Sequence, residues 1–148
     1  MRQELEDKLV EKYPKIFSQM KWFEHGDGWY NIIESLCACI QNECNHKIKT
    51  LKRENPQATE EEIEDLQTRA VQVKEKFGGL RFYIGSGSPE IYGMIRMAEE
   101  MSYRTCEDCG NPGQTRPGGW IRTLCDPCSL GPRAPVQPHD EEVGNEGS

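Results

Sequence analysis

Four cysteines near the end of the chain have the spacing of a metal site. Cys106 and Cys109 form one Cys-x-x-Cys pair, and Cys125 and Cys128 form a second pair after an intervening segment, residues 110–124. Two-residue gaps let both sulfurs of a pair reach the same ion, and four thiolates complete the tetrahedral shell of a structural zinc site. We therefore expect one Zn²⁺ per chain, held by these four residues in a zinc ribbon.

Two other kinds of site use the same ligands or the same spacing. A rubredoxin-like iron centre would transfer electrons through all four cysteines, whereas a thioredoxin-like redox site would use a single pair. The redox site requires a βαβ context, which this sequence lacks. Closed four-sulfur sites in short hairpins favour zinc over iron. We expect Gly118 and Gly119 to turn this hairpin and Trp120 to shield one side of the metal.

Three further cysteines and a histidine, Cys37, Cys39, Cys44 and His46, do not predict a second metal site. On one helix Cys37 and Cys44 share a face, but two turns separate them by roughly 10 Å along the axis, too far to share an ion. Cys39 points in another direction. We interpret these cysteines as buried free thiols on the core face of a helix.

His25 and Asp27 flank Gly26 and could act as a general base and its orienting carboxylate. No nucleophile motif, phosphate-binding glycine loop or carboxylate pair accompanies them. A role in a turn and a helix cap is the preferred interpretation, with Asp27 as N-cap of a long helix.

Periodicity and helix-start signals predict the elements that position these residues. A first helix should end at Pro14, which disfavours helical backbone at the residue before it. The long helix that starts at Asp27 should run to about residues 55–56. Its apolar face would consist of Trp29, Ile32, Ile33, Leu36, Ile40, Ile48 and Leu51. Thr59 and Ser88 are the expected N-caps of a short helix and of a final helix. The apolar face of that final helix would consist of Ile91, Met94, Ile95, Ala98 and Met101.

Between these helices apolar residues recur at every second position, the pattern of a β-strand. The segments "VQVKEKF" and "LRFYI" flank Gly78 and Gly79, which predicts a hairpin with a two-residue glycine turn. Phe77 would then face Leu80. The apolar face of the hairpin would also include Val71, Val73, Phe82 and Ile84.

The other face of this hairpin would carry Lys74, Lys76, Arg81 and Tyr83. In the expected register Lys76 lies opposite Arg81, and like charges there are destabilising unless an acidic group covers them. Lys74 would lie opposite Tyr83. Two sources of that acidic group stay open: the segment "TEEEIED" of residues 59–65, or an external acidic partner or phosphate-bearing ligand.

Length and composition indicate one domain with a small appended module. The chain has 148 residues, a net charge of -7 and seven cysteines. We expect an α+β domain over residues 1–103, the zinc ribbon over 104–129, and a disordered acidic tail over 130–148. An odd number of cysteines and a charged N-terminal segment favour a reducing compartment, and no apolar run is long enough to span a membrane. The sequence says nothing about oligomeric state.

Charge distribution makes nucleic acid an unexpected partner. Only residues 66–105 are net positive, with 6 basic against 4 acidic residues. The ribbon offers Arg104, Arg116 and Arg122 for phosphate contacts. Glu107, Asp108 and Asp126 lie beside them, so we expect local repulsion of DNA.

Three blocks, "GDGWYNIIESLC", "VQVKEKFGGLRFY" and "RTCEDCGNPG…GWIRTLCDPC", resemble small zinc-knuckle proteins encoded by tailed bacteriophages and prophages. The resemblance covers roughly residues 9–128, and the last ligand position of that group can be His where this chain has Cys128. It implies a setting in the bacterial host cytoplasm and a phage accessory role. It supplies no activity and no catalytic residues.

These observations predict an α+β fold in which the long helix and a C-terminal helix pack on a small antiparallel hairpin sheet. The leading functional hypothesis is a non-enzymatic, zinc-stabilised phage accessory protein that binds a host protein, through Lys74, Lys76, Arg81 and Tyr83, and modulates host metabolism or defence. One alternative is a nucleic-acid-binding zinc ribbon. Another is a binder of a phosphorylated small molecule or nucleotide signal at the same basic face. An enzyme built on His25 and Asp27 comes last.

Overall fold

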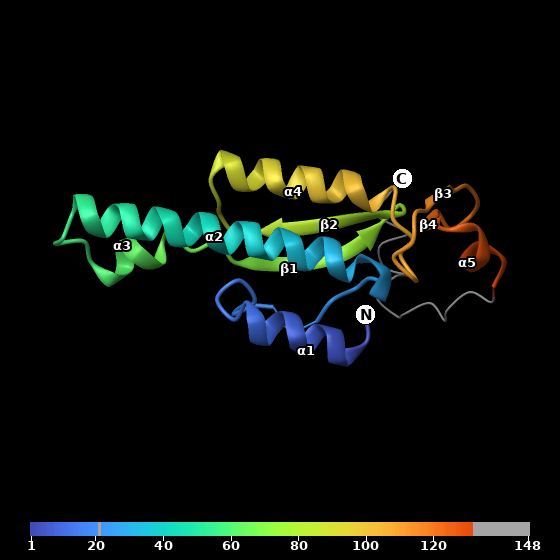
Figure 1. The fold of residues 1–148 in the computed structure, drawn as a ribbon, viewed down its shortest axis with the longest axis horizontal. Coiled ribbons are helices and arrows are strands. Elements are labelled where there is room, and N and C mark those ends of the chain that lie inside the picture. The colour runs from blue at the N-terminus through green and yellow to red at the C-terminus, as the bar shows by residue number, and fades with distance from the viewer. Residues whose placement is uncertain (21, 132–148) are drawn as a thin grey trace.

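The computed structural model describes residues 1–20 and 22–131 and has an α+β fold (Figure 1). β1 (Ala70–Lys76) and β2 (Gly79–Ile84) form a two-stranded antiparallel sheet. The long helix α2 (Tyr30–Glu54) and the helix α4 (Pro89–Ser102) lie beside this sheet. α4 contacts both α2 and β2, and α1 (Gln3–Lys12) lies on the β1 side. The predicted fold class of helices with a small antiparallel hairpin is confirmed.

One apolar core joins these elements. Its largest fully buried side chains include Trp29, Leu9 and Ile16, and α2 contributes Ile33 and Ile40. The predicted apolar face of α2 is confirmed only in its first half. Ile48 and Leu51 are half-buried, because the second half of α2 extends past the sheet toward the short helix α3 (Glu60–Glu64) (Figure 1). No helix among the described residues is both long and apolar enough to cross a membrane.

Helix ends follow the predicted signals at four of five places, including the end of α2 at Glu54, which was predicted at about residues 55–56. α1 ends at Lys12, just before Tyr13 and Pro14. Thr59 Oγ1 accepts a 3.1 Å hydrogen bond from the Glu62 N–H, and Ser88 Oγ accepts one of 3.3 Å from the Ile91 N–H. These bonds satisfy N–H groups that have no partner inside the helix.

The predicted start of the long helix is wrong. A 3₁₀ turn, η1 (Asp27–Trp29), precedes α2, whose first residue is Tyr30. The Asp27 carboxylate caps no helical N–H. It accepts hydrogen bonds from the backbone N–H and from Nε of Arg2, at 2.7 and 2.6 Å, so a tertiary contact has taken the place of a cap.

The hairpin turn lies one residue earlier than predicted, which shifts the partner of each strand residue by two positions. Lys76 pairs with Gly79, which places Phe77 and Gly78 in the turn with φ angles of 52° and 83°. Two positive φ angles are typical of the type I′ turn, whose twist matches that of the strands. Gly79 stays in β2 because the Tyr103 ring packs directly on it: a Cβ there would lie 2.3 Å from Tyr103 Cζ.

This register corrects several predicted pairs. Lys74 lies opposite Arg81, and Gln72 lies opposite Tyr83. Lys76 is therefore not opposite Arg81. At the other end of β1, an irregularity between Ala70 and Gln72 buries Ala70. Val71, predicted on the apolar face, is 48% exposed as a result. Met101, predicted on the apolar face of α4, is also exposed.

The last described part of the chain, which ends at residue 131, forms a small ribbon at the end of the molecule opposite α3 (Figure 1). β3 (Gln114–Arg116) pairs antiparallel with β4 (Arg122–Leu124), and α5 (Asp126–Leu130), a helix the sequence did not predict, follows. Gly118 and Gly119 lie in the connection between the strands, as predicted. The predicted acidic tail lies outside the described residues from residue 132 onward.

Candidate metal centre

The four predicted ligands form a single group. The sulfur atoms of Cys106, Cys109, Cys125 and Cys128 all lie within 4.8 Å of one another. Cys109 Sγ and Cys125 Sγ are 3.6 Å apart. A tetrahedral zinc site with Zn–S bonds of about 2.3 Å has S···S separations of about 3.8 Å. The four thiols are therefore at metal-binding distance, as the spacing predicted, and no other such group occurs in the described part of the chain.

Local backbone structure aims the two pairs at one point. After Cys106, the Gly110 N–H donates a 2.9 Å hydrogen bond to the Cys106 carbonyl, and Gly110 has a φ of 83°. This left-handed conformation suits glycine and closes the turn after the second ligand. On the other side, Cys125 immediately precedes α5 and Cys128 lies within it. The β3–β4 pairing brings the second pair back to the first.

The surroundings of Cys106 favour its ionised form. Burial alone raises the pKa of this thiol, but hydrogen bonds from the backbone N–H groups of Cys125, Cys109 and Asp108 and from the Cys109 thiol outweigh burial and lower the pKa to about 7. In the same cluster the pKa values of Cys109 and Cys128 are raised, so Cys106 is the thiol that ionises first. The thiolate is the form that binds metal. The backbone thus prepares at least one ligand for a cation. Trp120, predicted to shield the metal, is half-buried.

The first cysteine pair packs directly on the loop that precedes α2. The Gly28 N–H donates a 2.7 Å hydrogen bond to the Glu107 carbonyl, and Trp29 Nε1 donates one of 2.9 Å to the Thr105 carbonyl. A Cβ at Gly28 would lie 2.0 Å from the Cys106 carbonyl oxygen, so no side chain fits there. A Cβ at Gly26 would likewise lie 2.4 Å from the Glu107 carbonyl oxygen.

The turn of the β1–β2 hairpin also contacts the ribbon. Thr123 Oγ1 donates a 2.6 Å hydrogen bond to the Gly78 carbonyl, and both residues are buried. Ile121 lies beside Gly78, since a Cβ there would be 3.2 Å from Ile121 Cγ2. Two parts of the α+β domain thus contact the ribbon: the loop of residues 25–29 and the turn of the β1–β2 hairpin. We call this contact region the module junction. The three sequence blocks "GDGW", "KFGGL" and "CEDCG…TLC" meet at this junction.

Glu107 is a buried carboxylate at the module junction. Its Oε2 accepts a 3.0 Å hydrogen bond from the Gly26 N–H, and its Oε1 lies 3.6 Å from Arg122 Nη2 without a hydrogen-bond donor among the described residues. Burial raises the pKa of Glu107 to about 7, although Arg122 acts in the opposite direction. Nothing in the sequence indicated this burial, because glutamate is a residue type that is rarely buried.

The ribbon arginines proposed for nucleic acid are paired within the protein. Arg122 Nη2 lies 2.6 Å from Asp108 Oδ1, and the Arg122 side chain is 13% exposed. Arg116 Nη2 lies 2.7 Å from Asp126 Oδ1 and also donates to the Leu124 carbonyl. Arg104 is exposed.

His25 and Asp27 do not form a catalytic pair. His25 is buried between the rings of Phe23 and Trp29, and its Nδ1 lies 2.8 Å from the Gly26 carbonyl, which accepts the hydrogen bond. Burial lowers the pKa of His25 to about 4. A buried imidazole packed between two aromatic rings has no access to a substrate, and Asp27 is bound to Arg2. This arrangement supports the turn interpretation.

Among the described residues, the cysteines of α2 belong to no metal-binding group and form no disulfide. Cys37 and Cys44 are buried in the core, as predicted, whereas Cys39 is exposed. The Thr68 N–H donates to Cys44 Sγ at 3.5 Å. His46 is exposed.

The predicted basic face is divided by internal contacts. Lys74 is buried, because Glu24 lies beside β1 and forms backbone hydrogen bonds to the two neighbours of Lys74, Val73 and Glu75. Arg81 donates to the Tyr103 hydroxyl at 2.9 Å. Lys76 Nζ lies 5.7 Å from the centroid of the Phe77 ring. Tyr83 is exposed. Among the described residues, the segment 59–65 forms no ion pair with the three basic residues; its Glu64 pairs with Arg69.

Comparison with known proteins gives no family for the chain. No family model matches it, and no match was found among curated proteins or among solved structures. The resemblance to phage-encoded proteins stays a prediction.

Proposed function

We propose that this protein is a non-enzymatic protein-binding module whose ribbon is held by one zinc ion. Zinc is the proposed ion because four sulfur donors in a short hairpin form the closed shell of a structural site. The metal would keep the ribbon folded against the hairpin turn and the loop of residues 25–29, since assembly of such sites is coupled to folding. The binding surface is proposed to lie at this module junction.

The observation that carries the proposal is the conformation and exposure of Phe77. It has a φ of 52° and is 48% exposed at the tip of the hairpin. Left-handed backbone costs a non-glycine residue about 1–2 kcal/mol, and type I′ turns prefer Asn, Asp or Gly. A half-exposed aromatic ring does little to offset that cost through burial. Strain of this kind is typical of positions at which a side chain serves a function rather than the fold.

The neighbours of Phe77 indicate the chemistry of the partner. Ile121, 37% exposed, lies next to Gly78, and the Lys76 ammonium lies over the Phe77 ring. Aromatic residues with adjacent cations are frequent anchors of protein interfaces. We infer a protein partner with an apolar pocket bordered by acidic groups. The resemblance of the three sequence blocks to phage-encoded proteins supports a bacterial cytoplasmic host protein as that partner.

The experiment compares the wild-type protein with Phe77→Asn as baits in a bacterial lysate. Asparagine suits the turn, so we expect the free energy of unfolding to stay unchanged or to rise by up to about 1 kcal/mol. Met97→Gln is the matched control, because Met97 is 65% exposed on α4 away from the hairpin tip. A partner captured by wild type and by Met97→Gln but lost with Phe77→Asn supports the proposal. Equal capture by all three proteins would contradict it.

A further inference from the structure

A pocket lies at the opposite end of α2 from the module junction. It has a volume of about 370 Å³ and is bordered by α2, α3 and the loop after α1. Its lining consists of Lys15, Asn45, Ile48, Lys49, Lys52, Ile63, Glu64 and Gln67. This volume falls at the lower end of the range of small-molecule sites, about 300–1,000 Å³. The pocket shares no residue with the surface proposed above for protein binding.

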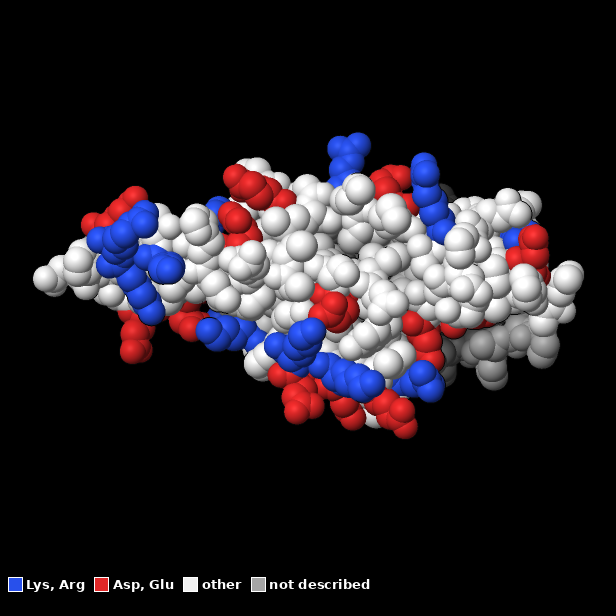
Figure 2. All heavy atoms as spheres, in the orientation of Figure 1, with Lys and Arg blue, Asp and Glu red and all other residues white. Residues whose placement is uncertain are grey.

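Three lysines in this lining lack an internal counter-charge. Lys15, Lys49 and Lys52 come from two separate segments, and none of them forms an ion pair with any described residue. Nearby lysines behave differently, because Lys12 pairs with Glu34 and Lys47 lies near Glu43 and Glu90. On the face drawn in Figure 2, basic side chains gather over the end formed by α2 and α3, with acidic side chains beside them, and a second row of basic side chains lies along the lower edge.

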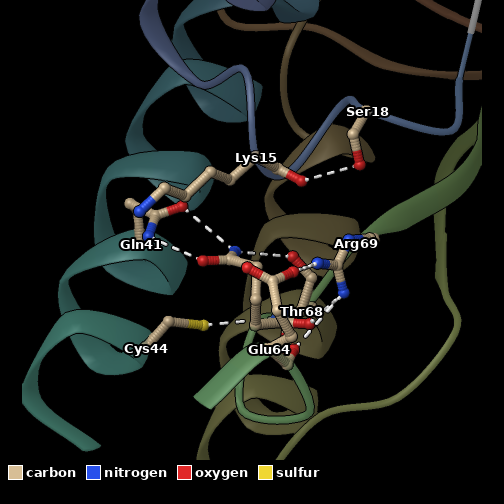
Figure 3. A network of polar contacts seen from close by, with 8 residues as sticks. Lys15, Ser18, Gln41, Cys44, Glu64, Thr68 and Arg69 are labelled. Carbon is tan, nitrogen blue, oxygen red and sulfur yellow. Dashed lines mark hydrogen bonds and ion pairs between the residues drawn. The ribbon is translucent and has the colours of Figure 1, made fainter. Parts of the chain in front are cut away.

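The acidic residue of the lining is neutralised within the protein. Glu64 pairs with Arg69 through its carboxylate, and Arg69 Nη1 also donates to the Gln67 carbonyl at 3.3 Å. Figure 3 shows this pair beside Thr68 and Gln41, with Lys15 extending from its loop toward α2. The Lys15 carbonyl accepts a 3.2 Å hydrogen bond from Ser18 Oγ, which holds that loop turn. The lysine charges therefore dominate the pocket.

A chain of side-chain amides orients hydrogen-bond donors at the pocket wall. Gln67 is 4% exposed and exchanges two hydrogen bonds with Gln41, at 3.0 and 3.1 Å. Gln41 Nε2 also donates to Asn45 Oδ1 at 2.9 Å. Asn45 is an exposed residue of the lining, and its NH₂ group has no acceptor among the described residues. Two half-buried apolar residues, Ile48 and Ile63, complete the wall.

We propose that this pocket binds a small phosphate-bearing metabolite of the size of a nucleotide. Ammonium groups and an amide NH₂ donate to phosphate oxygens, and charge-assisted hydrogen bonds of this kind are among the stronger polar contacts. Ile48 and Ile63 would pack against an apolar or planar part of the ligand. The lysines alone would suit any polyanion, whereas the limited volume and the apolar wall select a small molecule over an acidic peptide or a nucleic acid.

The test is a titration of ¹⁵N-labelled full-length protein with metal-free ATP, ADP, pyrophosphate and inorganic phosphate. We expect saturable shifts of the Asn45 and Gln67 side-chain amide signals, with tighter binding of ATP or ADP than of pyrophosphate. Lys49→Ala and Lys52→Ala should each weaken binding by about tenfold, the loss expected for one hydrogen bond from a charged group. Lys47→Ala is the matched control on the same helix, and it should bind as wild type does.

Several results would overturn this assignment. They are shifts that do not saturate with any of the four probes, an equal loss of affinity in Lys47→Ala, and pyrophosphate binding as tight as that of ATP. Tighter binding of a hexaglutamate peptide or of single-stranded DNA than of ATP would also overturn it, because the ligand would then be a macromolecule. Lys49 and Lys52 are exposed and Lys47 is only half-buried, so these substitutions leave the fold intact and the comparison stays interpretable.

Discussion

The backbone N–H of Gly28 donates a 2.7 Å hydrogen bond to the carbonyl of Glu107, the residue that follows the first cysteine ligand. The neighbouring Trp29 is fully buried in the main core and bonds through its indole N–H to the Thr105 carbonyl. The loop before α2 thus connects the core of the α+β domain to the first cysteine pair. Perturbing either side of this contact should affect both the metal centre and the stability of the whole protein.

Gly28→Ala should be strongly destabilising. The new Cβ would lie 2.0 Å from the Cys106 carbonyl oxygen, which is backbone and cannot move without displacing a ligand. We expect a loss of about 3 kcal/mol in the free energy of unfolding, at the upper end for overpacking, together with weaker zinc binding.

Gly93→Ala is the matched control for this substitution. Gly93 lies in α4, where an added Cβ would have nothing within 4 Å, so alanine should stabilise the helix by about 1 kcal/mol. Urea denaturation of the two variants measures both effects. Two alanine variants with equal stability would contradict the close approach at Gly28.

Removal of the metal should break the hydrogen bonds of the module junction before it breaks those of the β1–β2 sheet. Site assembly is coupled to folding, so chelation should speed hydrogen exchange at the Gly26 and Gly28 amides, both of which donate across the junction to Glu107. The Lys74 and Arg81 amides, in the middle of the β1–β2 pair, should keep their protection longer. Exchange measured by NMR with and without chelator tests this order. Uniform loss of protection would show that the ribbon and the domain unfold as one unit.

Local signals in the sequence were enough to predict the caps at Thr59 and Ser88 and the grouping of the four cysteines. Each cap depends on residues three positions apart, and the cysteine grouping depends on the two-residue gap inside each pair and on the short segment, residues 110–124, between the pairs. The hairpin register could not be predicted in this way, because either Gly78 or Gly79 could occupy the second turn position. The choice depends on Tyr103, which packs on Gly79 from a different element. The same holds for Glu107, whose burial results from a loop far away in the sequence.

Acid should destabilise the protein partly through His25. The folded-state pKa of about 4 lies below the ordinary value of 6.5 because burial disfavours the charged ring. The neutral ring is thus favoured in the folded state. Its contribution to the free energy of unfolding is fully present above pH 6.5 and is lost as the pH falls toward 4. Between pH 7.5 and pH 5 this loss amounts to about 2 kcal/mol.

His25→Phe separates the effect of His25 protonation from the effect of protonating the cysteine thiolates, because the thiolates are present in both wild type and variant. The variant should be less stable at pH 7.5, since it loses the hydrogen bond to the Gly26 carbonyl, but its stability should fall less on acidification. Urea denaturation at both pH values gives the comparison. Identical slopes for the two proteins would exclude His25 as a source of the pH dependence.

Duplex and single-stranded DNA should not bind measurably at about 0.15 M salt, where screening is already substantial. Arg116 and Arg122 are paired with Asp126 and Asp108, so few cations of the ribbon are available for phosphates. Fluorescence anisotropy with labelled oligonucleotides provides the measurement. Micromolar binding that is lost in Arg116→Ala and Arg122→Ala would favour a nucleic-acid-binding ribbon.

The metal content of the purified protein is the most direct test of the central claim, that one zinc ion holds the ribbon against the domain. Elemental analysis combined with an optical spectrum should give one zinc per chain and no visible absorption. Cys109→Ser should lower the zinc content and the melting temperature together. A well-folded protein without metal, or a red protein with one iron per chain, would contradict the claim.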